Sequence, residues 1–345
     1  MFQKINRDHQ MNTQRIFIFL GLMLLLSCKS TDLPLPQSEK LSPAKVQEIS
    51  ARIDRRHGDL PSEMRRRILE TVVRSIDNMV FIEGGEFEMG DFGIPCEYDP
   101  ADMCEWPCGL APEEMCPITM YTDDDHLHKV RLSSFYLSRY HTTLRDFDLF
   151  RTAHGKELFD KELRKREDLK ERFDPNKPAH TKEWQEVKEY CLWLGELSGY
   201  PVDLPTEAQW EYAARNRGKY VWYPTDNSNL EFGRNYPPRQ RNMNSKVFPV
   251  GSFAPNPLGL YDMVGNVKEW VNDWYEEKYY QVSPVENPMG PNNGDKKVMR
   301  GTPYFEEPWM TAHAVLRRDE EPVREDYYPT SGFRCAIQMD RPLKD

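Results

Sequence analysis

The stretch GLYDMVGNVKEWVNDWY, residues 259–275, decides the fold of this chain of 345 residues. It belongs to a C-terminal region of mostly loop and short strand, rich in Pro, Asn, Gly and aromatic residues. Long irregular connections are uncommon in a compact domain. A domain built in this way needs disulfides, metal ions or aromatic packing to fix its loops.

The segments that precede this stretch predict two helices. In LPTEAQWEYAARN, residues 204–216, Thr206 is the N-cap and Gln209 stands at the third helical position, which is the capping-box arrangement. Further upstream, residues 181–199 predict an amphipathic helix. Its apolar side consists of Trp184, Val187, Tyr190, Cys191 and Leu194.

The first part of the chain predicts helices followed by strands. Residues 79–90, MVFIEGGEFEMG, alternate and turn at Gly84-Gly85, which indicates strand, turn and strand. Residues 43–78 predict two short helices, the first of them capped by Ser42. This helical prefix either packs on the main domain or is offered to a partner.

The charge of the chain argues against a nucleic-acid partner. Lys and Arg number 46 and Asp and Glu number 56, which gives a net charge of −10. An acidic chain is repelled by the phosphate backbone, and no basic stripe interleaved with aromatics is visible. We therefore predict no nucleic-acid binding.

The N-terminus predicts export and a lipid anchor. An apolar run from Ile16 to Leu26 is too short to span a membrane and is typical of a signal peptide. It ends in LLSC, which resembles the bacterial lipobox. Such precursors are cleaved before the cysteine, here Cys28, which carries acyl chains such as palmitate. A plain secretory signal and a retained anchor helix are the alternatives.

The start of the chain is therefore divided into a signal peptide at 1–27 and a polar tether at 28–42. Lys29 follows the cysteine where Asp would favour the inner membrane. The expected localisation is the outer membrane, lipid-anchored and facing the periplasm.

Four cysteines lie within one loop of 21 residues: Cys96, Cys104, Cys108 and Cys116. In a cytosolic chain they would indicate zinc. In an oxidising periplasm two disulfides are the better interpretation, with three possible pairings that the sequence does not separate. Cys191 and Cys335 stand apart in apolar surroundings and are predicted to be buried thiols.

Four segments, in order, resemble the formylglycine-generating enzyme family, also called sulfatase-modifying-factor domains. They are MVFIEGGEFEMG, LPTEAQWEYAAR, GLYDMVGNVKEWVNDWY and SGFRCA. The resemblance implies one α+β domain at residues 79–340, with the C-type-lectin-like fold of this family. It implies little regular secondary structure and loops held partly by calcium.

The resemblance also implies where calcium binds. Family members use a side-chain oxygen, two backbone carbonyls and a carboxylate, and the matching positions are Asp262, Gly265, Val267 and Glu269. Such oxygen donors suit a hard cation with flexible coordination. Asp262 stands where many members carry Asn. The alternative is that Glu269 only hydrogen-bonds the backbone of a tight turn.

This chain lacks the two cysteines that bind copper in the oxidases of the family. In the oxidases two cysteines after an Arg-Gly pair bind copper(I), which activates oxygen to turn a substrate cysteine into formylglycine. Aligned on Arg300-Gly301, those two positions hold Glu306 and Thr311. Carboxylate and hydroxyl do not replace thiolates for a soft ion. Copper is therefore not expected, and we assign no catalytic residue.

We expect instead a groove that binds a peptide without catalysing a reaction on it. A groove that grips an extended peptide in the oxidases can grip one without oxidising it, and Arg and aromatic residues are typical of interface hot spots. The candidate groove residues are Tyr304, Phe305, Glu306, Trp309, Arg317 and Arg318. The alternative places the aromatics in the core and pairs the arginines with local Glu.

The predicted function is that of a non-catalytic periplasmic lipoprotein that binds a protein partner in an envelope assembly. Family precedent offers a secretion or gliding ring, or the regulation of a transmembrane kinase that controls a secretion machine. One alternative is a metal-dependent oxidoreductase of the formylglycine-generating or non-haem iron type. Another is a structural envelope protein without a dedicated partner.

Overall fold

The computed structural model describes residues 34–238, 247–323 and 330–343. The α-helices are α1 (Pro43–Arg56), α2 (Ser62–Asp77), α3 (Leu144–Ala153), α4 (Trp184–Ser198), α5 (Glu207–Ala214) and α6 (Pro308–Thr311). The 3₁₀-helices are η1 (Pro112–Glu114), η2 (Leu163–Lys165), η3 (Glu167–Phe173) and η4 (Tyr279–Gln281). The strands are β1 (Met79–Ile82), β2 (Gly85–Met89), β3 (Ile94–Pro95), β4 (Met115–Cys116), β5 (His128–Leu132), β6 (Phe135–Ser138), β7 (Val202–Asp203), β8 (Lys268–Trp274), β9 (Lys297–Arg300), β10 (Arg317–Glu320), β11 (Ser331–Gly332) and β12 (Ala336–Ile337).

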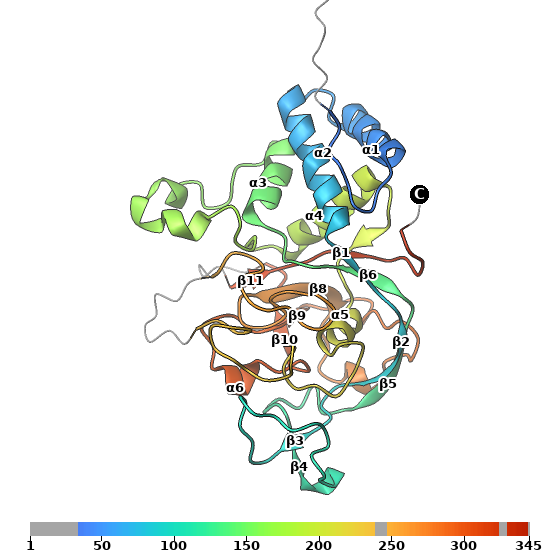
Figure 1. Ribbon diagram of the computed structural model, residues 1–345, viewed down its shortest axis with the longest axis vertical. Helices are drawn as coiled ribbons and strands as arrows, with labels where there is room; N and C mark the ends of the chain where they lie inside the picture. Colours follow the sequence, from blue (N-terminus) through green and yellow to red (C-terminus); the bar gives the residue numbers. More distant parts are fainter. Residues whose placement is uncertain (1–33, 239–246, 324–329, 344–345) are drawn as a thin grey trace, which may run out of the picture. The chain divides into compact units, whose positions relative to one another are not determined.

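The strands form two sheets of four, in the orders β1-β6-β12-β7 and β10-β9-β8-β11, and two pairs, β2-β5 and β3-β4. Helices and strands are mixed along the chain, as Figure 1 shows, so the predicted α+β class is confirmed. Long loops connect many of these short strands, which agrees with the expected scarcity of regular structure.

The predicted strands on either side of Gly84-Gly85 are present, but they do not pair with each other. β1 pairs antiparallel with β6, and β2 pairs antiparallel with β5. The turn between them packs tightly, because a Cβ at Gly84 would lie 2.2 Å from the carbonyl oxygen of Leu132. Only glycine fits there, and the chain passes from one sheet to another instead of closing a hairpin.

The two N-terminal helices pack on the rest of the domain. α1, α2, α3 and α4 lie together beside β1 and β6 in Figure 1. One continuous core holds side chains from these helices and from the first sheet: Ile49, Ile68, Phe147, Leu194, Tyr136 and Ile337. The helical prefix is therefore part of the folded unit and is not an exposed arm.

Both predicted helix caps are present. The side chain of Ser42 accepts a hydrogen bond from the N–H of Lys45 at 3.2 Å. Thr206 and Gln209 form the reciprocal capping box of α5, at 3.0 and 3.2 Å. A cap of this kind satisfies the first N–H groups of a helix and fixes where it begins.

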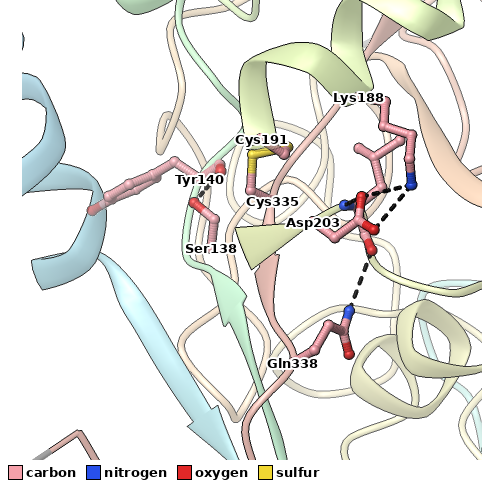
Figure 2. Close-up of a disulfide and its surroundings, with 8 residues drawn as sticks. Ser138, Tyr140, Lys188, Cys191, Asp203, Cys335 and Gln338 are labelled. Atoms are coloured by element: carbon pink, nitrogen blue, oxygen red, sulfur yellow. Dashed lines mark hydrogen bonds and ion pairs between the residues drawn. A yellow bond between two sulfur atoms is a disulfide. The ribbon is translucent and has the colours of Figure 1, made fainter. Parts of the chain in front are cut away.

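A disulfide joins the helical layer to the first sheet. Cys191 on α4 is bonded to Cys335, which directly precedes β12, and Figure 2 shows the bond between the two elements. The prediction that these two cysteines are free thiols is wrong. Both are fully buried, as expected, but the fold brings their Cα atoms to 5.6 Å, which a disulfide can span.

Within the part of the chain that the structure describes, no helix is long and apolar enough to cross a membrane. The predicted signal peptide at 1–27 and the predicted lipidation site Cys28 lie outside the described residues.

Candidate functional site

The segment after β9 places Glu306 and Thr311 at the start and end of a short turn that contains α6. The carboxylate of Glu306 accepts a hydrogen bond from the guanidinium of Arg318 on β10. The hydroxyl of Thr311 donates to the carbonyl oxygen of Glu307 at 2.9 Å. Both side chains are therefore engaged by their neighbours, and neither is a soft ligand.

Most of the predicted groove residues reach the surface. Phe305 is 54% exposed, and the neighbouring Met310 is 47% exposed. Four further groove residues are partly exposed: Tyr304, Glu306, Trp309 and Arg318. Arg317 does not belong to this surface: it is 1% exposed and its Nε lies 3.0 Å from Glu207. Its prediction as a groove residue is wrong, because a buried carboxylate binds it.

A buried ionic network anchors both ends of this segment to α5. Arg300 donates to Glu207 at 3.0 Å and to Glu211, one helical turn further, at 2.8 Å. Burial alone would raise the pKa of Glu207, but the guanidinium groups of Arg317 and Arg300 outweigh it and lower that pKa. Tyr280 adds a hydrogen bond at 3.0 Å. Breaking such a pair leaves a buried charge alone, so the network fixes the segment in place.

The residues of the predicted calcium site lie around one buried turn before β8. Asp262 and Gly265 have positive φ angles of 55° and 93°. One carboxylate oxygen of Asp262 accepts from the N–H of Gly251 at 2.8 Å, and its Oδ1 has no partner among the described residues. Glu269 accepts from Arg334 through both oxygens, at 2.7 and 2.9 Å.

Of these two carboxylates, Asp262 has an oxygen available to a cation, whereas both oxygens of Glu269 are already bonded. Nε2 of His141 lies 3.0 Å from Oε1 of Glu269, so this carboxylate already has three contacts. Burial would raise the pKa of Glu269, but Arg334 and His141 lower it to about 2. A cation would have to share Glu269 with a guanidinium. Oδ1 of Asp262 is an open oxygen, and because burial raises the pKa of Asp262, a proton can also satisfy it.

His313 is buried beside the segment and is neutral. Its Nε2 lies 3.0 Å from the carbonyl oxygen of Trp309, and its ring stacks on Tyr223 at 4.9 Å. Burial lowers the pKa of His313 to about 4. Across the described ranges, one group of three side chains is close enough to hold a metal ion, Asp91, Asp124 and Asp125. It contains carboxylates only, which is unlike the sulfur site of a copper(I) enzyme.

The loop cysteines form two disulfides, Cys96–Cys116 and Cys104–Cys108. This selects one of the three pairings and agrees with the interpretation as disulfides. The first bond closes the base of the loop at β3 and β4, and the second closes a short loop inside it.

A wide cleft of about 1170 Å³ lies between β7 and residues 338–343. Some of the polar side chains that line it bond to each other or to a neighbour. Gln209 and Gln338 exchange amide hydrogen bonds at 2.7 and 3.1 Å. Asp203 binds Lys188 at 2.9 Å, as Figure 2 shows.

Sequence reasoning missed the two arginine clusters. Glu207 and Glu211 are four residues apart in a helix that has no other charged residue, and that spacing was the available signal. Arg334 stands in SGFRCA, next to a cysteine already singled out, but nothing local links it to Glu269, which lies 65 positions away.

Known proteins are similar to this chain in sequence and in fold. The family described as "Sulfatase-modifying factor enzyme 1-like domain" matches residues 65–339. The formylglycine-generating enzyme of Streptomyces coelicolor is 32% identical over 177 residues, which cover 48% of this chain and 54% of that protein. The serine/threonine-protein kinase pkn1 of Chlamydia pneumoniae is 29% identical over 281 residues, which cover 77% of this chain and 38% of that protein.

A mouse protein named inactive C-alpha-formylglycine-generating enzyme 2 is 30% identical over 182 residues, covering 47% of this chain and 49% of that protein. The chain thus spans between 38% and 54% of the length of these relatives. Among solved structures, PvdO from Pseudomonas aeruginosa superposes with a TM-score of 0.55 at 24% identity. The match covers 76% of this chain and 94% of PvdO, and at this identity it shows the fold alone.

Proposed function

This chain belongs to the sulfatase-modifying factor enzyme 1-like family, and we propose that it is a member that binds a protein without oxidising it. One observation carries the proposal. Where copper(I) would need two thiolates, the chain has Glu306 and Thr311, each bonded to a neighbour. The mouse relative whose name calls it inactive supports the use of this scaffold without the oxidation.

The proposed setting is the periplasmic side of an outer membrane, with Cys28 as the lipid anchor and the partner a component of an envelope assembly. The lipobox-like LLSC supports the anchor, and three disulfides support an oxidising compartment. The partner surface would include Phe305 and Met310, which are apolar and about half exposed. Exposed apolar groups that adjoin aromatic and Arg side chains are typical of protein interfaces.

A peptide-oxidation assay tests the absence of catalysis. The mature chain with Cys28→Ser is incubated with copper, oxygen, a reductant and a sulfatase-type cysteine peptide, and the product mass is measured. We expect no aldehyde, because neither Glu306 nor Thr311 binds copper(I). The Streptomyces coelicolor enzyme serves as the active control. Aldehyde formed at catalytic rates would overturn the proposal.

Calcium at the turn of Asp262 and Glu269 is a second part of the proposal, supported by the open Oδ1 of Asp262. We expect added calcium to raise the Tm over that in a chelator, and Asp262→Ala to abolish the rise because it removes this oxygen. Glu269→Gln should lower the Tm under both conditions, because it leaves Arg334 buried with a weaker partner. A Tm of the unchanged chain that is equal with calcium and with chelator would contradict calcium binding.

A further inference from the structure

The acid excess of the chain is concentrated in one segment, residues 91–125, which we call the acidic lobe. It contains ten Asp and Glu residues and no Lys, Arg or His, whereas the whole chain has a net charge of −10. The rest of the chain is therefore balanced. The ten are Asp91, Glu97, Asp99, Asp102, Glu105, Glu113, Glu114, Asp123, Asp124 and Asp125.

The acidic lobe has almost no internal counter-charge. Among the described residues, Asp123 alone of the ten forms an ion pair, with its oxygen 3.9 Å from Nε of Arg317, while Arg300 acts on Asp124 at longer range. The other charged segment of the chain, residues 157–170, behaves differently. There Glu157 pairs with Lys161 at 2.7 Å, Glu167 pairs with Lys170 at 2.6 Å, and Asp160 lies 3.6 Å from Arg172. Asp124 is buried and burial raises its pKa to about 8, so the charge of the acidic lobe comes mainly from its exposed carboxylates, which are left for solvent or a partner to neutralise.

The acidic lobe is also held in a fixed shape despite this repulsion. The disulfide Cys96–Cys116 joins the two ends of its loop, and Cys104–Cys108 closes a smaller loop inside it. The N–H of Met103 donates to the side chain of Asn229 at 2.8 Å. The hydroxyl of Tyr98 donates to the carbonyl oxygen of Trp309 at 3.2 Å, which joins the lobe to α6. Figure 1 shows β3 and β4 of the lobe beyond α6, far from α1 and α2.

A pocket of about 370 Å³ opens within the acidic lobe. Its apolar walls are Phe92, Trp106, Leu110, Met115, Pro107 and Pro112. Trp106 is fixed there, because it stacks on Tyr220 with ring centroids 4.0 Å apart. Asp125 lies at the same pocket, exposed and with no side-chain partner among the described residues. The carboxylate of Asp91 lies within 4.8 Å of that of Asp125 and already accepts from the N–H groups of Gly93 and Ile118.

We propose that the acidic lobe docks a basic segment of a protein partner, with one Arg or Lys side chain of that segment inserted in the pocket beside Trp106 and Asp125. The proposal rests on the proposed protein-binding function and specifies its partner. Basic side chains bury their aliphatic stems along apolar walls while their charged ends reach an acid. An aromatic face attracts the cation further. The pocket volume is within the range of ligand sites.

The probe for this proposal is a fluorescent peptide with several arginines separated by Gly and Leu, and its matched control replaces every Arg with citrulline. Citrulline has almost the same shape without the charge. We expect the arginine peptide to bind the mature chain with Cys28→Ser, measured by fluorescence anisotropy, and to bind more weakly as sodium chloride increases. The citrulline peptide should bind at least about tenfold more weakly.

Two charge-matched variants locate the site. The lobe variant carries Glu97→Gln, Asp102→Asn, Glu105→Gln and Asp125→Asn, which are all exposed. The control variant carries Glu157→Gln, Glu162→Gln, Glu167→Gln and Asp168→Asn, so both variants have the same net charge. We expect the lobe variant to lose about tenfold or more in affinity and the control variant to lose little.

Each outcome decides the proposal. Equal losses in both variants would mean general attraction to an acidic protein and would overturn a docking site. Equal binding of the two peptides to the unchanged chain would also overturn it, whatever the variants do. Failure here is separate from failure of the proposed function, because aldehyde formation in the oxidation assay refutes non-catalytic binding alone. A partner cross-linked elsewhere on the domain would refute the lobe alone.

Discussion

Asp273 lies buried next to the start of α5, where it accepts from the N–H of Glu207 at 2.8 Å. Burial, and then the charge of Glu207, raise the pKa of Asp273 from 3.8 to about 7. The folded state therefore holds this proton more tightly than the unfolded state does. The stability that the proton contributes is complete below the unfolded pKa and is lost as the pH rises from 3.8 to about 7.

Replacing Asp273 with Asn should remove this loss. Asp273→Asn retains an oxygen for the N–H of Glu207 and has no charge to bury. We expect its Tm to exceed that of the unchanged chain above pH 7, and the difference to shrink toward pH 4. Each kcal/mol would shift the Tm by roughly 2 °C or somewhat more in a domain of this size. Thermal unfolding followed by circular dichroism gives both curves, and parallel curves would refute the pKa assignment.

The role of a residue was predictable from the sequence where its partner is a close neighbour along the chain. The caps Ser42 and Thr206 follow from their positions before a helix and are confirmed. Arg317 was placed wrongly because its partner Glu207 is 110 positions away. Glu269 and Arg334 form a similar long-range pair. Whether a charge is exposed or paired inside depends on tertiary contacts, which one sequence does not display.

The disulfide between α4 and the end of the chain should contribute more stability than the one inside the acidic lobe. Cys191 and Cys335 are 144 positions apart, and Cys104 and Cys108 only 4. Loop-closure entropy predicts about 5 kcal/mol for the longer loop and about 2 kcal/mol for the shorter one. Chemical denaturation of Cys191→Ala with Cys335→Ala should show a loss of about 2–5 kcal/mol. The matched pair Cys104→Ala with Cys108→Ala should lose less, and the reverse order would contradict this account.

Elements with strong periodicity were predictable, and short ones were not. The apolar face of α4, from Trp184 to Leu194, is buried as its spacing indicates. Several strands, such as β7 and β12, have only two residues, too few to show a period. The charged stretch near residue 165 forms two 3₁₀-helices without a buried residue, so no apolar face holds a longer helix.

At the level of the whole domain, the four motifs were sufficient to identify the family, whose model matches residues 65–339. The packing of the first two helices was left open by the sequence, since an amphipathic face does not reveal what covers it. The acidic lobe was visible as a cysteine-rich loop, but its lack of counter-charges became clear only when every carboxylate could be checked for a partner.

The position of β12 has a consequence for how the protein acquires its fold. Its two residues, near the end of the chain, pair with β6 on one side and β7 on the other, so they complete the middle of the first sheet. Before β12 pairs, β6 and β7 each have an unpaired edge, and the disulfide between Cys191 on α4 and Cys335 has not formed. Pairings between such distant segments form slowly. A chain stopped before residue 335 would therefore leave edges of β6 and β7 unpaired, and unpaired strand edges favour aggregation.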